Sequence, residues 1–94
     1  MHFVVIAKDG TDPEAPTRRL AVREKHLEDV KPSVASGFVQ IGGALLNNEG
    51  TMIGSMMLLE AESEEAVWEF LKNDIYSTAH VWQSYEVYPF RRAV

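Results

Sequence analysis

The 94-residue chain contains no cysteine, and this absence removes several kinds of chemistry at once. Without cysteine there is no disulfide framework, no thiolate nucleophile and no thiolate metal ligand. Basic residues are also few, with nine Lys and Arg against fourteen Asp and Glu. The resulting net charge of −5 argues against contact with a phosphate backbone, so we expect no nucleic-acid partner.

Long apolar runs are missing as well. No stretch approaches the roughly 20 apolar residues of a membrane span, and the N-terminal segment MHFVVIAKDG lacks the length and basic leader of a secretion signal. We expect a soluble cytoplasmic protein without membrane contact. His, Asp and Glu do not occur at metal-ligand spacing, and no glycine-rich phosphate loop is present. The sequence therefore predicts neither a metal nor another cofactor.

The remaining composition is that of an ordinary globular chain, with 46% hydrophobic and 24% charged residues. Its length suits one core, so residues 1–94 are expected to form a single domain. Apolar patterns and turn residues predict strands at 2–8, 38–46, 52–61 and 81–90, and helices at 17–36 and 63–72. Residues 11–16 are expected to be a loop, 47–51 a hairpin turn and 73–80 a loop or one short turn.

Single residues support the predicted ends of the two helices. Gly37 is expected to end the first helix in a left-handed conformation, and Ser63 to cap the second helix ahead of two glutamates. Pro32 should kink the first helix on its solvent side.

The order β-α-β-β-α-β predicts a ferredoxin-like α+β fold, an antiparallel sheet with both helices on one face. Two helices leave the other face open, yet residues of both parities are apolar, such as Met56 and Met57. An exposed apolar face needs a partner. The simplest partner is a second copy, packed sheet against sheet as a homodimeric α+β barrel.

The first helix carries the most informative polar residues. Arg23 and His26 lie within roughly 40° and 20° of Arg19 around the helix axis. Two guanidiniums and an imidazole suit the binding of an anion and the transfer of a proton. Leu20, Leu27, Val30 and Val34 form an apolar stripe beside them, so the basic stripe should lie where helix meets sheet, at the rim of a pocket.

The segment RRLAVREKHL at 18–27 resembles the R-L-x-x-R-x-x-H-L helix of the YciI-like (YCII) family. Three further segments follow in the family's order: the glycines at 37 and 42–43, the stretch 54–74, and EVYPF at 86–90. The resemblance implies the dimeric ferredoxin-like fold and an active site centred on a histidine and an aspartate, here His26 and Asp74. The family often has Asp-Pro-Tyr at the second position, where this chain has Asp74-Ile75-Tyr76.

Four further residues are candidate substrate contacts. Gly42 and Gly43 either relieve crowding or form a bulge within the sheet, or let bare backbone approach a ligand. Ser55 can donate a hydrogen bond into the pocket or face solvent. Tyr76 can cover the pocket or simply pack.

Two functions follow from these residues. One is an enzyme in which His26 acts as general acid or base and Asp74 orients it, catalysing an isomerase, lyase or dehydrochlorinase-like reaction on a small anionic or phenolic metabolite. The other is a non-catalytic dimeric module that binds a small ligand or a partner protein. Loss of turnover or mere loss of affinity on mutation of His26 separates the two.

Overall fold

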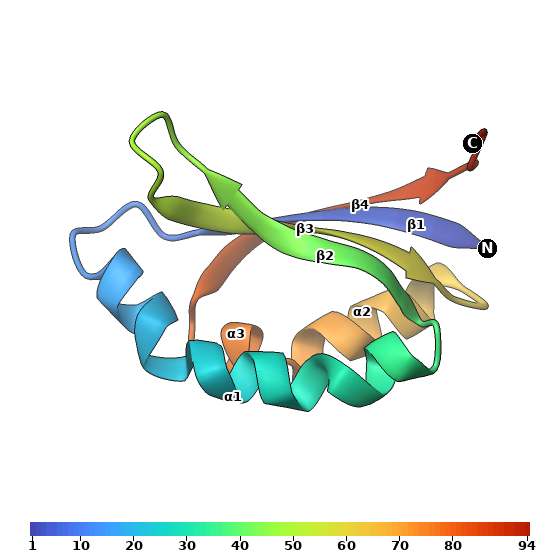
Figure 1. Cartoon of the computed structure of the whole chain (residues 1–94), viewed down its shortest axis with the longest axis horizontal. Helices are drawn as coiled ribbons and strands as arrows, with labels where there is room; N and C mark the ends of the chain where they lie inside the picture. Colours follow the sequence, from blue (N-terminus) through green and yellow to red (C-terminus); the bar gives the residue numbers. More distant parts are fainter.

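The computed structural model describes residues 1–94 as one four-stranded antiparallel sheet with its helices on one face (Figure 1). The strands are β1 (His2–Asp9), β2 (Val39–Leu46), β3 (Met52–Glu60) and β4 (Trp82–Phe90). The helices are α1 (Ala15–Ala35), α2 (Glu64–Asn73) and the single turn α3 (Ile75–Thr78). The predicted α+β ferredoxin-like arrangement is confirmed.

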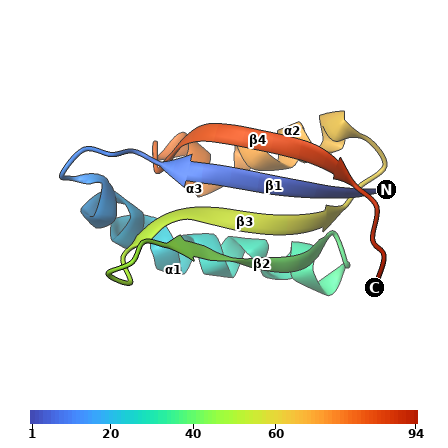
Figure 2. The same cartoon turned by 90° about the horizontal axis from the view of Figure 1, so that it is seen from above.

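The strands lie in the order β2-β3-β1-β4, so the two strands joined by the hairpin occupy one half of the sheet (Figure 2). In β1, Phe3, Val5 and Ala7 alternate with less buried residues and point toward the helices. Met57 and Leu59 of β3 join the same core. No helix is both long and apolar enough to cross a membrane.

Element ends differ from the predicted ones by one or two residues. The main difference is α1, which begins at Ala15 rather than at residue 17, because Pro16 fits the first turn of a helix, where no backbone N–H is needed. The helix continues through the exposed Pro32 to Ala35, and Gly37 has the predicted positive φ of 84°. Ser63 caps α2 as predicted, accepting the Ala66 N–H at 3.2 Å.

Much of the predicted apolar stripe of α1 is exposed, although Leu27, Val30 and Val34 lie on the side of the helix that faces the sheet. Leu20, Leu27 and Val34 are 61%, 43% and 53% exposed, whereas Arg19 is only 3% exposed. The helix directs Arg19 and His26 toward the sheet, and the ion pairs that these side chains form below the helix remove the cost of burying them. Arg19 and His26 of the basic stripe therefore lie where helix meets sheet, as predicted, whereas Arg23 is exposed.

Candidate active site

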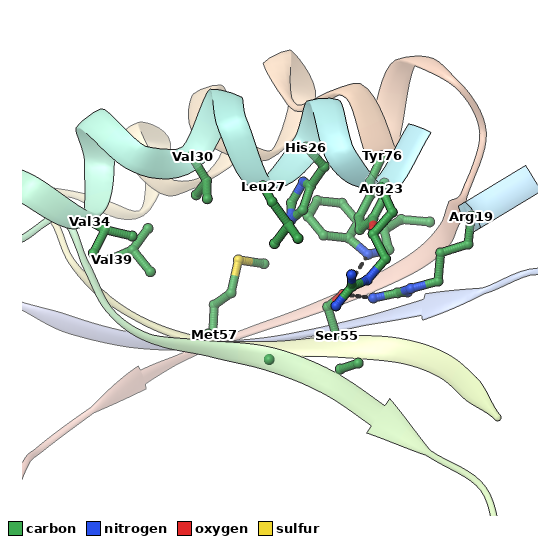
Figure 3. A pocket seen from close by; sticks show the side chains of 14 residues that line it. Arg19, Arg23, His26, Leu27, Val30, Val34, Val39, Ser55, Met57 and Tyr76 are labelled. Atoms are coloured by element: carbon green, nitrogen blue, oxygen red, sulfur yellow. Dashed lines mark hydrogen bonds between the residues drawn. The ribbon is translucent and has the colours of Figure 1, made fainter. Parts of the chain in front are cut away.

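A cavity of about 320 Å³ separates the middle of α1 from the sheet (Figure 3). Its polar lining comes from Arg19, Arg23, His26, Ser55 and Tyr76. Its apolar lining comes from Leu27, Val30, Val34, Val39, Met57 and Trp82. All the predicted substrate contacts, Gly42 and Gly43 included, thus line one pocket. Asp74 lies behind His26.

His26 and Asp74 are directly paired. The Nδ1 atom of His26 lies 2.8 Å from Oδ1 of Asp74, and the two side chains are 13% and 8% exposed. An ionised carboxylate only accepts hydrogen bonds, so Nδ1 carries the proton and Nε2 of the neutral ring keeps a lone pair. No residue of the chain hydrogen-bonds Nε2, which leaves this nitrogen for a molecule in the pocket.

The backbone at Asp74 keeps its shape without the family's proline. Asp74 has φ −70° and ψ 141°, the extended conformation that a residue before proline adopts. Here a helix cap holds it, because Oδ1 of Asp74 accepts the Tyr76 N–H at 2.8 Å. The same oxygen therefore caps α3 and accepts the hydrogen bond from Nδ1 of His26.

Two aromatic rings fix the plane of the imidazole. Tyr76 stacks on His26 with ring centroids 3.9 Å apart and planes 7° apart, and Trp82 meets it edge-on at 5.8 Å. Burial raises the pKa of the Tyr76 phenol above its ordinary value, although the charges of Arg19 and Arg23 oppose the shift. Tyr76 therefore presents a neutral hydroxyl at neutral pH.

Arg19 is held by Asp9, the last residue of β1, for which no role in the site was predicted. Its Nη1 donates to both carboxylate oxygens of Asp9, at 2.9 and 3.0 Å, and its Nη2 donates to Oγ of Ser55 at 2.9 Å. Burial raises the pKa of the Asp9 carboxyl, and the hydrogen bond and charge of Arg19 oppose this shift. Strand alternation could have identified Asp9, which continues the inward series of Phe3, Val5 and Ala7.

Arg23, one turn after Arg19, has a different environment. It is exposed, no carboxylate pairs with it, and its side chain extends from α1 toward the sheet near Ser55 (Figure 3). The charge of Arg19 is already balanced by Asp9. The predicted pair of anion contacts is thus divided, and Arg23 carries the uncompensated positive charge of the pocket.

Crowding within the chain does not explain the two glycines of β2. A Cβ on Gly42 would meet Val39 and Met57 at ordinary contact distances of 3.6 and 3.7 Å, and a Cβ on Gly43 would meet nothing within 4 Å. The register shifts in this strand lie between Val39 and Ile41 and between Leu45 and Leu46, so neither falls at the glycines. The approach of a ligand to bare backbone remains a prediction.

No group of three or more His, Asp or Glu side chains could hold a metal ion.

The fold and the site together define a class: small ferredoxin-like α+β proteins with a His–Asp pair at a pocket beneath the first helix. The sequence model of the YCII-related domain matches residues 1–91, so the chain belongs to the YCII-related family, as its motifs predicted.

Two fungal proteins are similar to this chain in sequence. Fusaric acid biosynthesis protein 2 of Gibberella fujikuroi is 30% identical over 98 residues, covering 96% of this chain and 92% of that protein. An aspartate kinase of Fusarium oxysporum f. sp. lycopersici is 30% identical over 98% of this chain, which spans only 18% of the kinase's length.

A solved structure is also similar over almost its whole length. It is the 5-chloro-2-hydroxyhydroquinone dehydrochlorinase TftG of Burkholderia phenoliruptrix, in complex with 2,5-dihydroxybenzoquinone. The two chains superpose with a TM-score of 0.85 and 28% sequence identity, covering 99% of this chain and 96% of the other.

Proposed function

We propose that this chain is an enzyme of small-molecule metabolism in which His26 transfers a proton to and from a phenolic or otherwise anionic substrate. The observation that carries the proposal is the 2.8 Å bond from Nδ1 of His26 to Asp74, which leaves the lone pair of Nε2 in the pocket. Asp74 fixes the tautomer and stabilises the imidazolium that forms during proton transfer.

The chemistry is that of an isomerase or lyase, including dehydrochlorination. Nε2 of His26 takes a proton from the substrate, and the electron pair left behind moves into the ring system, where it forms a new double bond or expels a leaving group such as chloride. In an isomerisation, the imidazolium returns the proton at another atom of the substrate. In an elimination, it releases the proton to solvent.

The pocket supports a small ring as substrate. A volume of about 320 Å³ with mostly apolar walls suits one aromatic ring, and Arg23 supplies positive charge at the mouth. The quinone bound by the related dehydrochlorinase is a molecule of this type. We propose that the substrate contacts Arg19, Ser55 and Tyr76. The absence of side chains at Gly42 and Gly43 would let its ring lie close to β2.

The test is turnover of a panel of hydroxylated aromatics that includes 5-chloro-2-hydroxyhydroquinone, followed by chloride release and absorbance. His26→Asn should lower kcat by about 10²–10⁴-fold, the usual contribution of a general acid or base. Asp74→Asn, which preserves a capping side chain, should lower kcat by about tenfold or more. His80→Asn is the matched control, because His80 is exposed and has a φ of 60° that asparagine tolerates.

Turnover by His26→Asn at the rate of the unchanged protein would contradict the proposal. Binding of panel members without turnover, weakened by the same substitution, would instead favour the non-catalytic binding module.

We further propose that the protein is a homodimer formed through the open face of the sheet. Ile41 and Leu58 are paired neighbours in β2 and β3, and Leu58 pairs with Val4 of β1, on the face opposite Phe3 and Val5. Tyr88 continues this row on β4. A second copy would cover this apolar row, since all three helices lie on the other face (Figure 1).

A further inference from the structure

The lining of the cavity changes from polar to apolar along α1. On this helix the lining residues form one stripe, in which Leu27, Val30 and Val34 lie within roughly 40° of Arg23 around the helix axis. The stripe is basic before His26 and apolar after it. A ligand that lies along α1 therefore meets positive charge on one side of His26 and hydrocarbon on the other.

The part of the cavity beyond His26, here called the apolar end, is enclosed by five hydrophobic side chains: Leu27, Val30, Val34, Val39 and Met57. The polar side chains that line the cavity lie on the other side of His26 (Figure 3). Val39 and Met57 are 7% and 5% exposed, so the sheet side of the apolar end belongs to the hydrophobic core.

The helix side of the apolar end is only partly covered. Leu27 and Val34 are 43% and 53% exposed. In β2, the edge strand of the sheet, Gly42 pairs with Met57, so a side chain at Gly42 would point to the same face as Met57. A Cβ there would meet Val39 and Met57 at 3.6 and 3.7 Å. The apolar end therefore has accessible hydrocarbon on one side and, at Gly42, space for a further apolar group.

The cavity is also larger than one ring requires. An apolar cavity of about 150 Å³ holds a benzene molecule, whereas this cavity has a volume of about 320 Å³. Eight residues separate His26 from Val34, which corresponds to a rise of about 12 Å along α1. A ring whose hydroxyl contacts Nε2 of His26 occupies only part of this length, so a group attached to the ring can fill the rest.

We infer that the substrate is a hydroxylated ring with an apolar substituent, such as an alkyl chain, and that this substituent lies along the apolar end. The inference rests on the proposed function, because the hydroxyl at His26 sets the direction of the ring. A chain packed against Leu27, Val34 and Met57 removes hydrocarbon of both partners from water. The unbranched, flexible side chain of Met57 can adapt to chains of different shape. A charged substituent would find no partner there.

The experiment compares 4-alkylphenols, which share one hydroxyl and differ only in the chain. Phenol, 4-methylphenol, 4-propylphenol and 4-pentylphenol are titrated into the full chain, and their affinities are measured by NMR. Each added methylene should increase the affinity about two- to fourfold, the effect of burying one CH₂ group in a partly open site. The terminal methyl group of 4-pentylphenol should show nuclear Overhauser contacts with the methyl groups of Val34.

Two variants change the apolar end itself. Gly42→Val places a side chain beside Val39 and Met57, and it should reduce the preference for 4-pentylphenol over phenol about tenfold or more, because the chain loses its space. Leu27→Gln replaces hydrocarbon with an amide and should reduce the preference about three- to tenfold. Leu20→Gln is the matched control and should leave it unchanged, because Leu20 is exposed on the same helix and does not line the cavity.

The fold of each variant is checked by circular dichroism. If Gly42→Val does not fold, Leu27→Gln decides, since Leu27 is already exposed. Equal affinities for phenol and 4-pentylphenol would overturn the inference. A preference that persists in every folded variant would also overturn it, because the chain would then bind another apolar surface, such as the open face of the sheet.

Binding of the chain does not require proton transfer, so the preference for 4-pentylphenol should persist in His26→Asn. Failure of this inference leaves the loss of turnover in His26→Asn intact, whereas failure of the proposed function leaves the preference for the longer chain intact.

Discussion

Arg19 and Arg23 have the same side chain and lie one helical turn apart, yet the fold gives them opposite uses. Arg19 is buried against Asp9, where its charge is balanced and where Nη1 and Nη2 donate to Asp9 and Ser55, whereas its buried Nε has no partner in the chain. Arg23 is exposed and has no acidic partner. A buried guanidinium is stable only when it is paired and hydrogen-bonded, so position alone decides which arginine remains available to an anion.

Tyr76 gives a prediction in alkaline solution. Burial raises the pKa of this phenol above its ordinary value of 10.0. As the pH rises above 10.0, the unfolded chain ionises first, so the free energy of unfolding falls until the folded pKa is passed. Tyr76→Phe removes this loss. The free energy of unfolding of the unchanged protein minus that of the variant, measured by urea unfolding, should fall as the pH rises above 10. Plots of the two free energies against pH that run parallel would contradict the pKa shift.

At the scale of elements, the single turn α3 contributes to the site because the residue that caps it, Asp74, also bonds to His26. Its first turn is capped by Asp74, whose Oδ1 also accepts the hydrogen bond from Nδ1 of His26. The Ser77 hydroxyl donates to the Leu71 carbonyl at 2.6 Å and so ties α3 to the end of α2. These two bonds fix Asp74 at the junction of α2 and α3. A fixed Asp74 in turn holds the imidazole of His26 in place.

Strand β3 gives a prediction about glycine. A Cβ on Gly54 would lie 2.6 Å from the Ala7 carbonyl oxygen and 3.3 Å from Cα of Lys8, and these backbone atoms cannot move without disturbing the β1–β3 ladder. Gly54→Ala should therefore lower the free energy of unfolding by about 1–3 kcal/mol, as overpacking does. Gly43→Ala, with open space around its Cβ, should change it by less than about 0.5 kcal/mol.

Chemical denaturation of the two variants measures both effects. Equal stability of Gly54→Ala and Gly43→Ala would mean that the β1–β3 backbone yields at this point.

At the scale of the whole molecule, the sheet has two faces with different partners. The face toward the helices carries the core and the pocket, and the other face carries a row of apolar side chains without a covering layer. Ile41 and Tyr88 on that face are 56% and 51% exposed. A contiguous apolar face of this kind is typical of a protein–protein interface.

The proposed dimer is tested by one charge on this face. Ile41→Glu should weaken dimerisation by roughly a hundredfold, because a symmetric interface would bury the new charge twice. Light scattering at micromolar concentration should then give a monomer. Leu20→Glu is the control, since Leu20 is 61% exposed on α1, away from the sheet. A monomeric unchanged protein, or an Ile41→Glu variant that stays dimeric, would contradict the arrangement.

The sequence by itself determined the order of elements, the fold and the family. These depend on local patterns: alternating or continuous apolar residues, the Ser63 cap, the Gly37 helix end and the helix motif that contains His26. Each pattern acts through neighbours in the chain, so each can be read without coordinates.

Only the tertiary structure decided which polar side chains meet. Asp9, Arg19, Ser55 and Trp82 come from β1, α1, β3 and β4, and they share one hydrogen-bond network because those elements pack together. Which arginine is neutralised, and which donors the Ser55 hydroxyl accepts, depends on burial and on distances between distant segments. No local pattern carries that information, since the desolvation that makes these bonds strong exists only after the chain has folded.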